Sequence, residues 1–379
     1  AGALDPVLEQ QTTYPIVSSD ATQAPFAVDA TVSDVDCCHE LIECCQPVFV
    51  PNMIGDALAL PVINITSQGS QFSHLPVVRP STNNSPYPRD RFSVEYRQYV
   101  DAFVYQNPNG NTGGPVDSEI EQYTIRWEKT FCCGQYSVDV IVPLIDGPRF
   151  DQTAGDQAPS QDLQFGDLTV GLKGIICQDA CKVISAGLQI EAPTAANIHN
   201  ANLGAFAFSA DRDEWHFTPY LAAAYTPNEC LFAQAFVGYR VATSDMTIRT
   251  PGVGPIHNAR SPDAVMVDLG IGYWLDGPCC GPVCRWAPTV ELHYYGTTEN
   301  HQYVSTGNLG LVNTGFGTVD YVNLTVGANA ELCNGGTLAA GFVFPTRSNT
   351  AFIPPTVHND STDRFYDWQF VLQYNHFSW

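Results

Sequence analysis

The chain has 379 residues, of which 44% are hydrophobic and 15% are charged, and its formal net charge is −23. No apolar run reaches 18 residues, which excludes a transmembrane helix, and 16 basic residues against 39 acidic ones argue against nucleic-acid binding. The 30 Gly, 27 Pro, 6 Trp, 17 Tyr and 20 Phe favour strands and turns, and helical periodicity is hard to find after about residue 60. The expected fold class is therefore all-β.

The 13 cysteines indicate an oxidising compartment, because so many thiols are rarely kept reduced and idle in a cytosol. Their odd number leaves at least one thiol unpaired or joined to another molecule. Ala1, Gly2 and Ala3 fit the residues that a signal peptidase leaves behind. We therefore expect a mature exported protein whose signal peptide has been removed.

Residues 1–90 are rich in proline and show no clean alternation. We expect an irregular, cysteine-containing extension that covers the periplasmic end of the protein, plugs it, or reaches a neighbouring subunit. Two phrases stand out, NMIGD at 52–56 and NNSPYPRDR at 83–91. The charged triplet 89–91 is expected to anchor the chain in a lumen or at its rim, unless it only marks a polar turn.

Residues 91–379 are expected to form a transmembrane antiparallel up-and-down β-barrel. An even strand number is what closure of a bacterial antiparallel barrel generally requires, and twelve strand-like segments are found. They lie at about 92–105, 119–131, 135–145, 163–176, 182–192, 215–225, 231–242, 264–275, 286–296, 318–332, 337–345 and 364–379.

Alternation is clearest where Val322, Leu324 and Val326 alternate with Asn323 and Thr325. Lipid on one face and a wet lumen on the other would produce this pattern. A soluble β-sandwich is the alternative, but its strands usually run about 5 or 6 residues, whereas about 9 to 11 are needed to cross a bilayer. The expected lipid-facing set is Tyr123, Ile125, Trp127, Val138, Val140, Val142, Leu144, Leu168, Val170, Leu172, Val265, Val267, Leu269, Ile271 and Tyr273.

The opposite face carries charged residues that a soluble core could not hold. These are the candidates to line a pore, where they would attract or repel ions and narrow the passage. They are Glu95, Arg97, Asp101, Arg126, Glu128, Asp139, Asp167, Lys173, Glu191, Arg240, Asp268, Glu291 and Glu331.

The connections between the segments alternate between short and long, as in outer-membrane barrels with short periplasmic turns and long external loops. Every cysteine after residue 45 falls at a short turn, so bridges there would rigidify the periplasmic rim and add about 2 to 4 kcal/mol each. A bridge between Cys177 and Cys181 is geometrically plausible if their Cα atoms lie within about 7 Å. The disulfide candidates are Cys37, Cys38, Cys44, Cys45, Cys132, Cys133, Cys177, Cys181, Cys230, Cys279, Cys280, Cys284 and Cys333.

Signals for other chemistry are weak, and we expect no enzyme, no catalytic residues, no metal and no cofactor. The segment 37–45, CCHELIECC, offers ligands that zinc would accept, but it lacks a CxxC pair and disulfides are favoured. Pairs such as Glu291 with His293, or His216 with Tyr220, lack an evident serine nucleophile. Two sets of acidic residues could bind calcium, although solvated loops are favoured: Asp146, Asp151 and Asp156, and Asp360, Asp363 and Asp367.

The phrase at 83–91, the upstream NMIGD, the cysteine-bearing head and the barrel-like remainder resemble the β-barrel porins of Planctomycetes. The resemblance implies an outer-membrane location and channel function, and it supplies no catalytic residues. The carboxyl end departs from a usual barrel end, because the aromatic positions change parity before Phe377 and Trp379. A bulge near Asn375 would restore the alternation, unless the assembly signal itself differs.

The expected function is an outer-membrane, porin-like channel for small hydrophilic solutes, with a cation bias and a disulfide-stabilised periplasmic rim. The alternative is a structural or surface-layer barrel that is plugged or assembles into arrays or appendages. A hydrolase sited in the lumen or at the rim is the weakest alternative. The expected partners are outer-membrane lipid, small solutes or ions, and a homo-oligomer or neighbouring envelope proteins.

Overall fold

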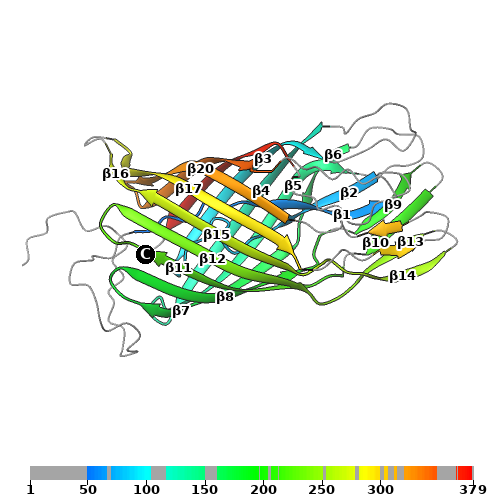
Figure 1. The fold of residues 1–379 in the computed structure, drawn as a ribbon, viewed down its shortest axis with the longest axis horizontal. Helices are drawn as coiled ribbons and strands as arrows, with labels where there is room; N and C mark the ends of the chain where they lie inside the picture. Colours follow the sequence, from blue (N-terminus) through cyan, green and yellow to red (C-terminus); the bar gives the residue numbers. More distant parts are fainter. Residues whose placement is uncertain are drawn as a thin grey trace, which may run out of the picture.

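The computed structural model forms an antiparallel β-barrel (Figure 1). It describes residues 49–65, 70–103, 117–149, 160–195, 197–203, 206–211, 213–250, 253–277, 281–298, 303–305, 311–313, 320–347, 364 and 366–377. Within these ranges twelve long strands form the wall: β3 (Arg91–Phe103), β4 (Asp117–Phe131), β5 (Tyr136–Arg149), β7 (Leu168–Gln178), β8 (Lys182–Ala192), β11 (His216–Tyr225), β12 (Leu231–Ala242), β15 (Ala264–Tyr273), β17 (Val283–Thr297), β20 (Asp320–Leu332), β21 (Gly336–Pro345) and β22 (Trp368–Phe377). The predicted fold class and strand number are confirmed.

Closure of the barrel comes from the pairing of the last strand with the first. Each strand pairs with its neighbour in the chain, and β22 pairs with β3 from Trp368↔Val100 to Phe377↔Arg91. The alternating sequence therefore becomes two faces of one closed sheet. On β20, for example, Asn323 and Thr325 are buried inside while Val326 is exposed outside.

The two ends of the barrel differ, as Figure 1 shows. One end carries the five short turns, the small strand β16 (Leu275–Asp276) and the carboxyl end of the chain; we call it the short-turn end. Beyond the other, long-loop end lie β6 (Ser160–Phe165) and two four-stranded sheets. One sheet has the strand order β14-β13-β10-β9 and consists of β9 (Ile198–Leu203), β10 (Phe206–Asp211), β13 (Met246–Thr250) and β14 (Val253–Ala259). The other has the order β18-β19-β1-β2 and consists of β1 (Leu58–Ile65), β2 (Ser70–Val77), β18 (Tyr303–Ser305) and β19 (Leu311–Asn313).

The residues before β3 thread the barrel twice. Residues 49–57 start near Trp274 at the short-turn end and reach Tyr99 near the long-loop end, where the Tyr99 hydroxyl donates to Ala57 O at 3.2 Å. The hairpin β1–β2 then pairs with β19 beyond that end, and residues 78–90 return to the start of β3. We call 49–57 and 78–90 the inner segments. The extension was expected to be irregular, but it contains this hairpin.

Two expectations about the short-turn end are wrong. Cys181 is disulfide-bonded, but Cys177 is not its partner, and a register shift places Cys177 opposite Ile184 in the neighbouring strand. The pairing of β22 is regular through Asn375, without the suggested bulge, and Phe377 is buried inside the barrel. Among the described residues, no helix is long and apolar enough to cross a membrane.

Candidate functional site

The inward direction of the predicted pore-lining residues is seen in the structure, while their role in a pore stays a prediction. Every member of the set whose side chain is described is buried; the side chain of Asp101 lies outside the description. The buried members are Glu95, Arg97, Arg126, Glu128, Asp139, Asp167, Lys173, Glu191, Arg240, Asp268, Glu291 and Glu331. Most of them contact one another or the inner segments.

The backbone of Ile54 and Gly55 is held from two sides of the lumen. Glu291 on β17 accepts hydrogen bonds from the amide of Ile54 at 2.8 Å and from that of Gly55 at 2.7 Å. Arg97 on β3 donates to the carbonyl oxygens of Ile54 at 2.8 Å and of Gly55 at 3.1 Å. Hydrogen bonds to charged groups are roughly twice as strong as neutral ones. One anion and one cation from different strands thus fix the backbone of the same two residues.

Gly55 has the backbone conformation that this double contact requires. Its φ is +71°, and a Cβ added there would lie 2.8 Å from Thr82 Cα. Thr82, on the returning inner segment, also donates through its hydroxyl to Asp56 O at 3.1 Å. A side chain at position 55 would therefore separate the two inner segments.

Asp56 is the most highly bonded carboxylate of the inner segments. Its Oδ1 accepts from the Tyr366 hydroxyl at 2.9 Å and from Gln369 Nε2 at 3.0 Å. Its Oδ2 accepts from Asn323 Nδ2 at 2.7 Å and lies 3.3 Å from Arg79 Nη1. These donors include residues of two strands of the wall and of the returning inner segment, so Asp56 joins the three.

Arg79 extends the contacts of Asp56 across the lumen. Its Nη2 lies 2.5 Å from Asp268 Oδ1 on β15. Asp268 also contacts His293 Nδ1 at 2.9 Å, and His293 Nε2 lies 3.3 Å from Glu291 Oε2. A continuous polar chain therefore links the two inner segments to neighbouring strands of the wall.

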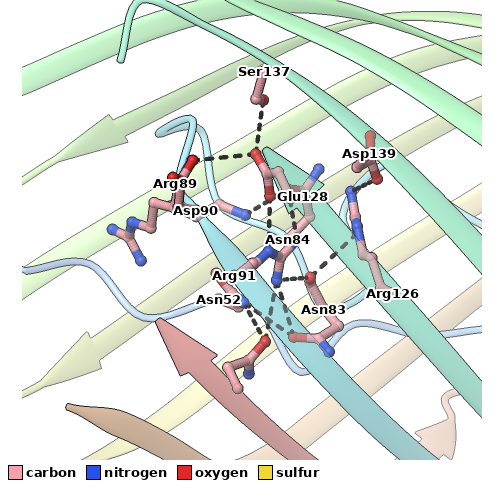
Figure 2. A network of polar contacts seen from close by, with 12 residues as sticks. Asn52, Asn83, Asn84, Arg89, Asp90, Arg91, Arg126, Glu128, Ser137 and Asp139 are labelled. Carbon is pink, nitrogen blue, oxygen red and sulfur yellow. Dashed lines mark hydrogen bonds and ion pairs between the residues drawn. The ribbon is translucent and has the colours of Figure 1, made fainter. Parts of the chain in front are cut away.

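A second centre, nearer the short-turn end, is built around Glu128 on β4 (Figure 2). Its Oε2 lies 2.7 Å from Arg91 Nε, and its Oε1 accepts from the Ser137 hydroxyl at 2.7 Å and from the Arg89 amide at 3.3 Å. Lys173 on β7 adds an ion pair at 3.0 Å. The turn into β3 is thus anchored inside the barrel, which is one of the two outcomes expected for the charged triplet 89–91.

The phrase at 83–91 and the phrase at 52–56 lie side by side. Met53 N donates to Asn84 O at 2.9 Å, and Asn52 Nδ2 donates to Asn83 Oδ1 at 3.0 Å. From the wall, Lys173 donates to Asn84 Oδ1 at 3.0 Å. Sequence reasoning had singled out both phrases but had no signal that they meet.

The short-turn end is closed by aromatic and cationic side chains. Phe49 packs against Trp274 and Phe377 with ring centroids 6.0 Å apart in each case, and Trp274 Nε1 donates to Phe49 O at 2.9 Å. The Arg89 guanidinium lies 4.5 Å from the centroid of the Phe49 ring, and that of Arg285 lies 4.4 Å from Trp274. The inward direction of Phe377, which breaks the outward aromatic alternation, is explained by its contact with Phe49.

Ion pairs elsewhere in the lumen join wall to wall. Arg126 Nη2 lies 2.5 Å from Asp139 Oδ2, and Arg240 Nη2 lies 2.9 Å from Glu191 Oε1. A buried pair adds little net stability, but removing one partner leaves an unpaired buried charge and costs about 3 to 5 kcal/mol. Both pairs join strands of the wall, and Arg126 also donates to Thr82 O at 3.0 Å and to Asn83 O at 3.2 Å on the returning inner segment.

Glu214 lies just outside the strands at the long-loop end. Its carboxylate accepts from Ser261 N and from Ser261 Oγ, both at 2.6 Å. Burial raises the pKa of Glu214 to about 7, against the lowering effect of the hydrogen bonds from Ser261. Its charge therefore changes close to neutral pH.

The cysteines at the short turns form at least one complete bridge, between Cys284 and Cys333. Cys132 and Cys133 are exposed thiols on the β4–β5 turn, so not every cysteine of the rim is bridged. The candidates Cys37, Cys38, Cys44, Cys45, Cys279 and Cys280 lie outside the described residues.

The outer face of the barrel is apolar, and none of the predicted lipid-facing residues is buried. Its exposed large side chains include Phe92, Val94, Ile125, Trp127, Leu172, Leu221, Val237, Leu269, Ile271, Val290, Leu292, Val326, Leu338, Phe342 and Leu372.

The remaining chemical suggestions find no assembled site among the described residues, where no group of three His, Cys, Asp or Glu side chains could hold a metal ion. Four members of the two acidic sets, Asp151, Asp156, Asp360 and Asp363, lie outside the description, as does the segment 37–45. His293 contacts carboxylates and Thr325 instead of a serine. Asp56 and Arg79, which hold the inner segments, were not singled out from the sequence as site residues.

No protein-family model matches the chain, and none of the curated proteins matches it. Among solved structures it is similar to an outer membrane channel from Pseudomonas putida F1, with 13% identity, 79% of this chain and 99% of that chain covered, and a TM-score of 0.47. It is also similar to the beta domain of the Bordetella autotransporter BrkA, with 14% identity, 77% of this chain and 100% of that chain covered, and a TM-score of 0.42. A third similar structure is the Pseudomonas putida toluene transporter TodX, with 10% identity, 87% of this chain and 98% of that chain covered, and a TM-score of 0.40.

Proposed function

We propose that this protein is a porin-like channel of the bacterial outer membrane whose lumen stays closed until the inner segments shift. The observation that carries the proposal is the contrast between the two faces of one closed sheet. The outer face exposes large apolar side chains on neighbouring strands, and the inner face buries charged and polar ones. In water such an outer face would be a continuous apolar patch, whereas lipid accommodates it.

The way in which the inner segments are held supports a movable closure. Much of their contact with the wall consists of hydrogen bonds and ion pairs, as at Ile54, Gly55 and Asp56. Groups of this kind can exchange protein partners for water, so each neutral bond contributes only about 0.5 to 1.5 kcal/mol net and each bond to a charged group about 1.5 to 3 kcal/mol. Water entering the lumen can therefore replace many of these contacts as the segments shift.

A cation bias follows from the charges that an open lumen would present. Among the described wall residues, eight buried carboxylates face five buried cations. The carboxylates are Glu95, Glu128, Asp139, Asp167, Glu191, Asp268, Glu291 and Glu331, and the cations are Arg91, Arg97, Arg126, Lys173 and Arg240. Displacing the inner segments would also remove Arg79 from Asp268, which adds to the negative potential seen by a solute.

A permanently closed structural barrel is the second candidate. It is favoured by the number of strands that hold the inner segments, since β3, β12, β17, β20 and β22 all donate to or accept from residues 49–57. In this case the polar contacts would stiffen the barrel instead of forming a closure.

Single-channel recording from the full-length, detergent-purified chain in a planar bilayer under a KCl gradient tests the proposal. We expect cation-selective steps from the wild type and a higher open probability from Asp268→Asn, which weakens the contact with Arg79. The matched control is Glu331→Gln, which also removes one negative wall charge but contacts Arg285 at the rim. Silence of wild type and Asp268→Asn, with both proteins folded and heat-modifiable, would support the structural barrel instead.

A further inference from the structure

One part of the lumen wall presents polar side chains that do not hold the inner segments. It lies on β7, β8, β11 and β12 near the long-loop end, where Thr169 pairs with Glu191, Glu191 with His216, and Gln189 with Thr218 across neighbouring strands. We call the six inward-facing residues of this region the polar patch: Thr169, Gln189, Glu191, His216, Thr218 and Arg240.

Several groups of the polar patch are buried without a hydrogen bond to any described residue. They are the hydroxyl of Thr169, both polar amide atoms of Gln189 and both ring nitrogens of His216, in residues that are 5% exposed or less. The nearest carboxylate oxygens to His216 are those of Glu191, 3.5 Å from Nδ1, and Glu214, 3.9 Å from Nε2. A buried polar group left without a partner usually costs about 1 to 3 kcal/mol, so a cluster of them needs an explanation.

Retention of the inner segments does not explain the polar patch. Where the wall holds these segments, its amide nitrogens donate to them: Gln369 donates to Ala57 O at 2.9 Å, and Gln373 donates to Ile54 O at 2.6 Å. Against the polar patch lies Pro80, whose Cγ would be 3.3 Å from a Cβ placed at Gly238. Proline has no N–H to donate, and no described residue of the inner segments forms a hydrogen bond with the side chains of Thr169, Gln189 or His216.

We propose that the polar patch is a binding site for a small uncharged polyhydroxy solute. The inference rests on the channel function proposed above and names a class of solute for it. An amide and an imidazole each offer one donor and one acceptor side, and a hydroxyl offers both, which matches the hydroxyl groups of such a solute. The two charges of the polar patch, Arg240 and Glu191, already neutralise each other at 2.9 Å, and a charged solute would have to disturb that pair.

Equilibrium binding to the full-length protein in detergent, measured by saturation-transfer NMR, tests the proposal. The probes are D-glucose, which is uncharged, gluconate, which is an anion, and glucosamine, which is a cation. We expect glucose to bind best, more readily in the Asp268→Asn background, where the inner segments are less firmly held. Gln189→Leu should weaken glucose binding by about tenfold or more, since two hydrogen bonds are lost. Thr169→Val should weaken it by a smaller factor.

The matched control is Gln98→Leu, the same chemical change on β3 at a position that faces outward and is not buried. We expect it to leave glucose binding unchanged. Gln189→Leu also removes two buried groups that lack partners, so its thermal stability should equal or exceed that of the wild type. That combination of lost binding and retained stability is not expected of a residue with only a structural role.

Three results would overturn the proposal: equal glucose binding by Gln189→Leu and the wild type, tighter binding of either charged probe, or no binding of glucose even in the Asp268→Asn background. The NMR measurement of binding does not depend on ion current. Absence of single-channel currents together with glucose binding that depends on Gln189 would therefore refute only the channel function. Currents together with unchanged glucose binding in Gln189→Leu would refute only the site.

Discussion

Replacing Glu291 by glutamine should release the inner segments from the wall while leaving the barrel folded. The carboxylate accepts two backbone hydrogen bonds, from Ile54 at 2.8 Å and from Gly55 at 2.7 Å. A glutamine has one acceptor oxygen, so one of the two amides would face an NH2 group and lose its partner. Losing one hydrogen bond to a charged group costs about 1.5 to 3 kcal/mol, and the orphaned amide adds about 1 to 3 kcal/mol.

These terms overlap, so we expect a net weakening of about 3 to 4 kcal/mol, or roughly 150- to 1,000-fold in the ratio of held to released segments. Hydrogen exchange of peptides covering 49–57, followed by mass spectrometry, measures that ratio directly. The control, Glu331→Gln, should leave the exchange of this segment unchanged. Unchanged protection at 49–57 in Glu291→Gln would refute the reasoning, provided that the variant migrates as a folded, heat-modifiable barrel.

Three further predictions concern the backbone, the long-loop end and the rim. Gly55→Ala should expose the inner segments to protease, at a cost of about 1 to 3 kcal/mol, whereas Gly134→Ala, also at positive φ but with nothing within 4 Å, should not. The raised pKa of Glu214, about 7, means that the folded form favours the neutral acid. The stability that this provides is present below about pH 4 and is lost as pH rises through 7. Local hydrogen exchange should therefore increase over that range, and Glu214→Gln should abolish the trend. Reducing the bond between Cys284 and Cys333, or Cys284→Ser, should lower the heat-modification temperature by an amount that reflects about 2 to 4 kcal/mol, and unchanged heat modification would contradict a role for this bridge in the rim.

The barrel wall was predictable because each strand faces two different surroundings. Lipid outside and polar groups inside impose a period of two that survives in residues such as Val326 and Asn323, whichever partners they contact. The strands beyond the long-loop end were not anticipated. Some of them, such as β18 and β19, are only 3 residues long, and such short strands carry no period of their own.

The course of the inner segments could not be predicted, because their partners lie far away in the chain. Asn52 donates to Asn375, a residue 323 positions later, and Gln373 donates to Ile54 across 319 positions. Nothing local distinguishes a wall glutamine that holds the backbone of Ile54 from one such as Gln189, whose side chain makes no hydrogen bond to a described residue. The sequence phrases at 52–56 and 83–91 did mark segments that contact the wall. Their contact with each other could not be predicted, because it forms only inside the closed barrel.

The path of the chain through its own barrel has a consequence for biogenesis. The hairpin β1–β2 is paired with β19 beyond one end of the barrel, while both of its connections run back through the lumen to the other end. The seam between β22 and β3 joins the twelfth wall strand to the first. The hairpin β1–β2 precedes β22 in the chain, so it is synthesised well before the seam can form. The simplest order of assembly is therefore one in which the wall closes around the inner segments and the seam between β22 and β3 forms last.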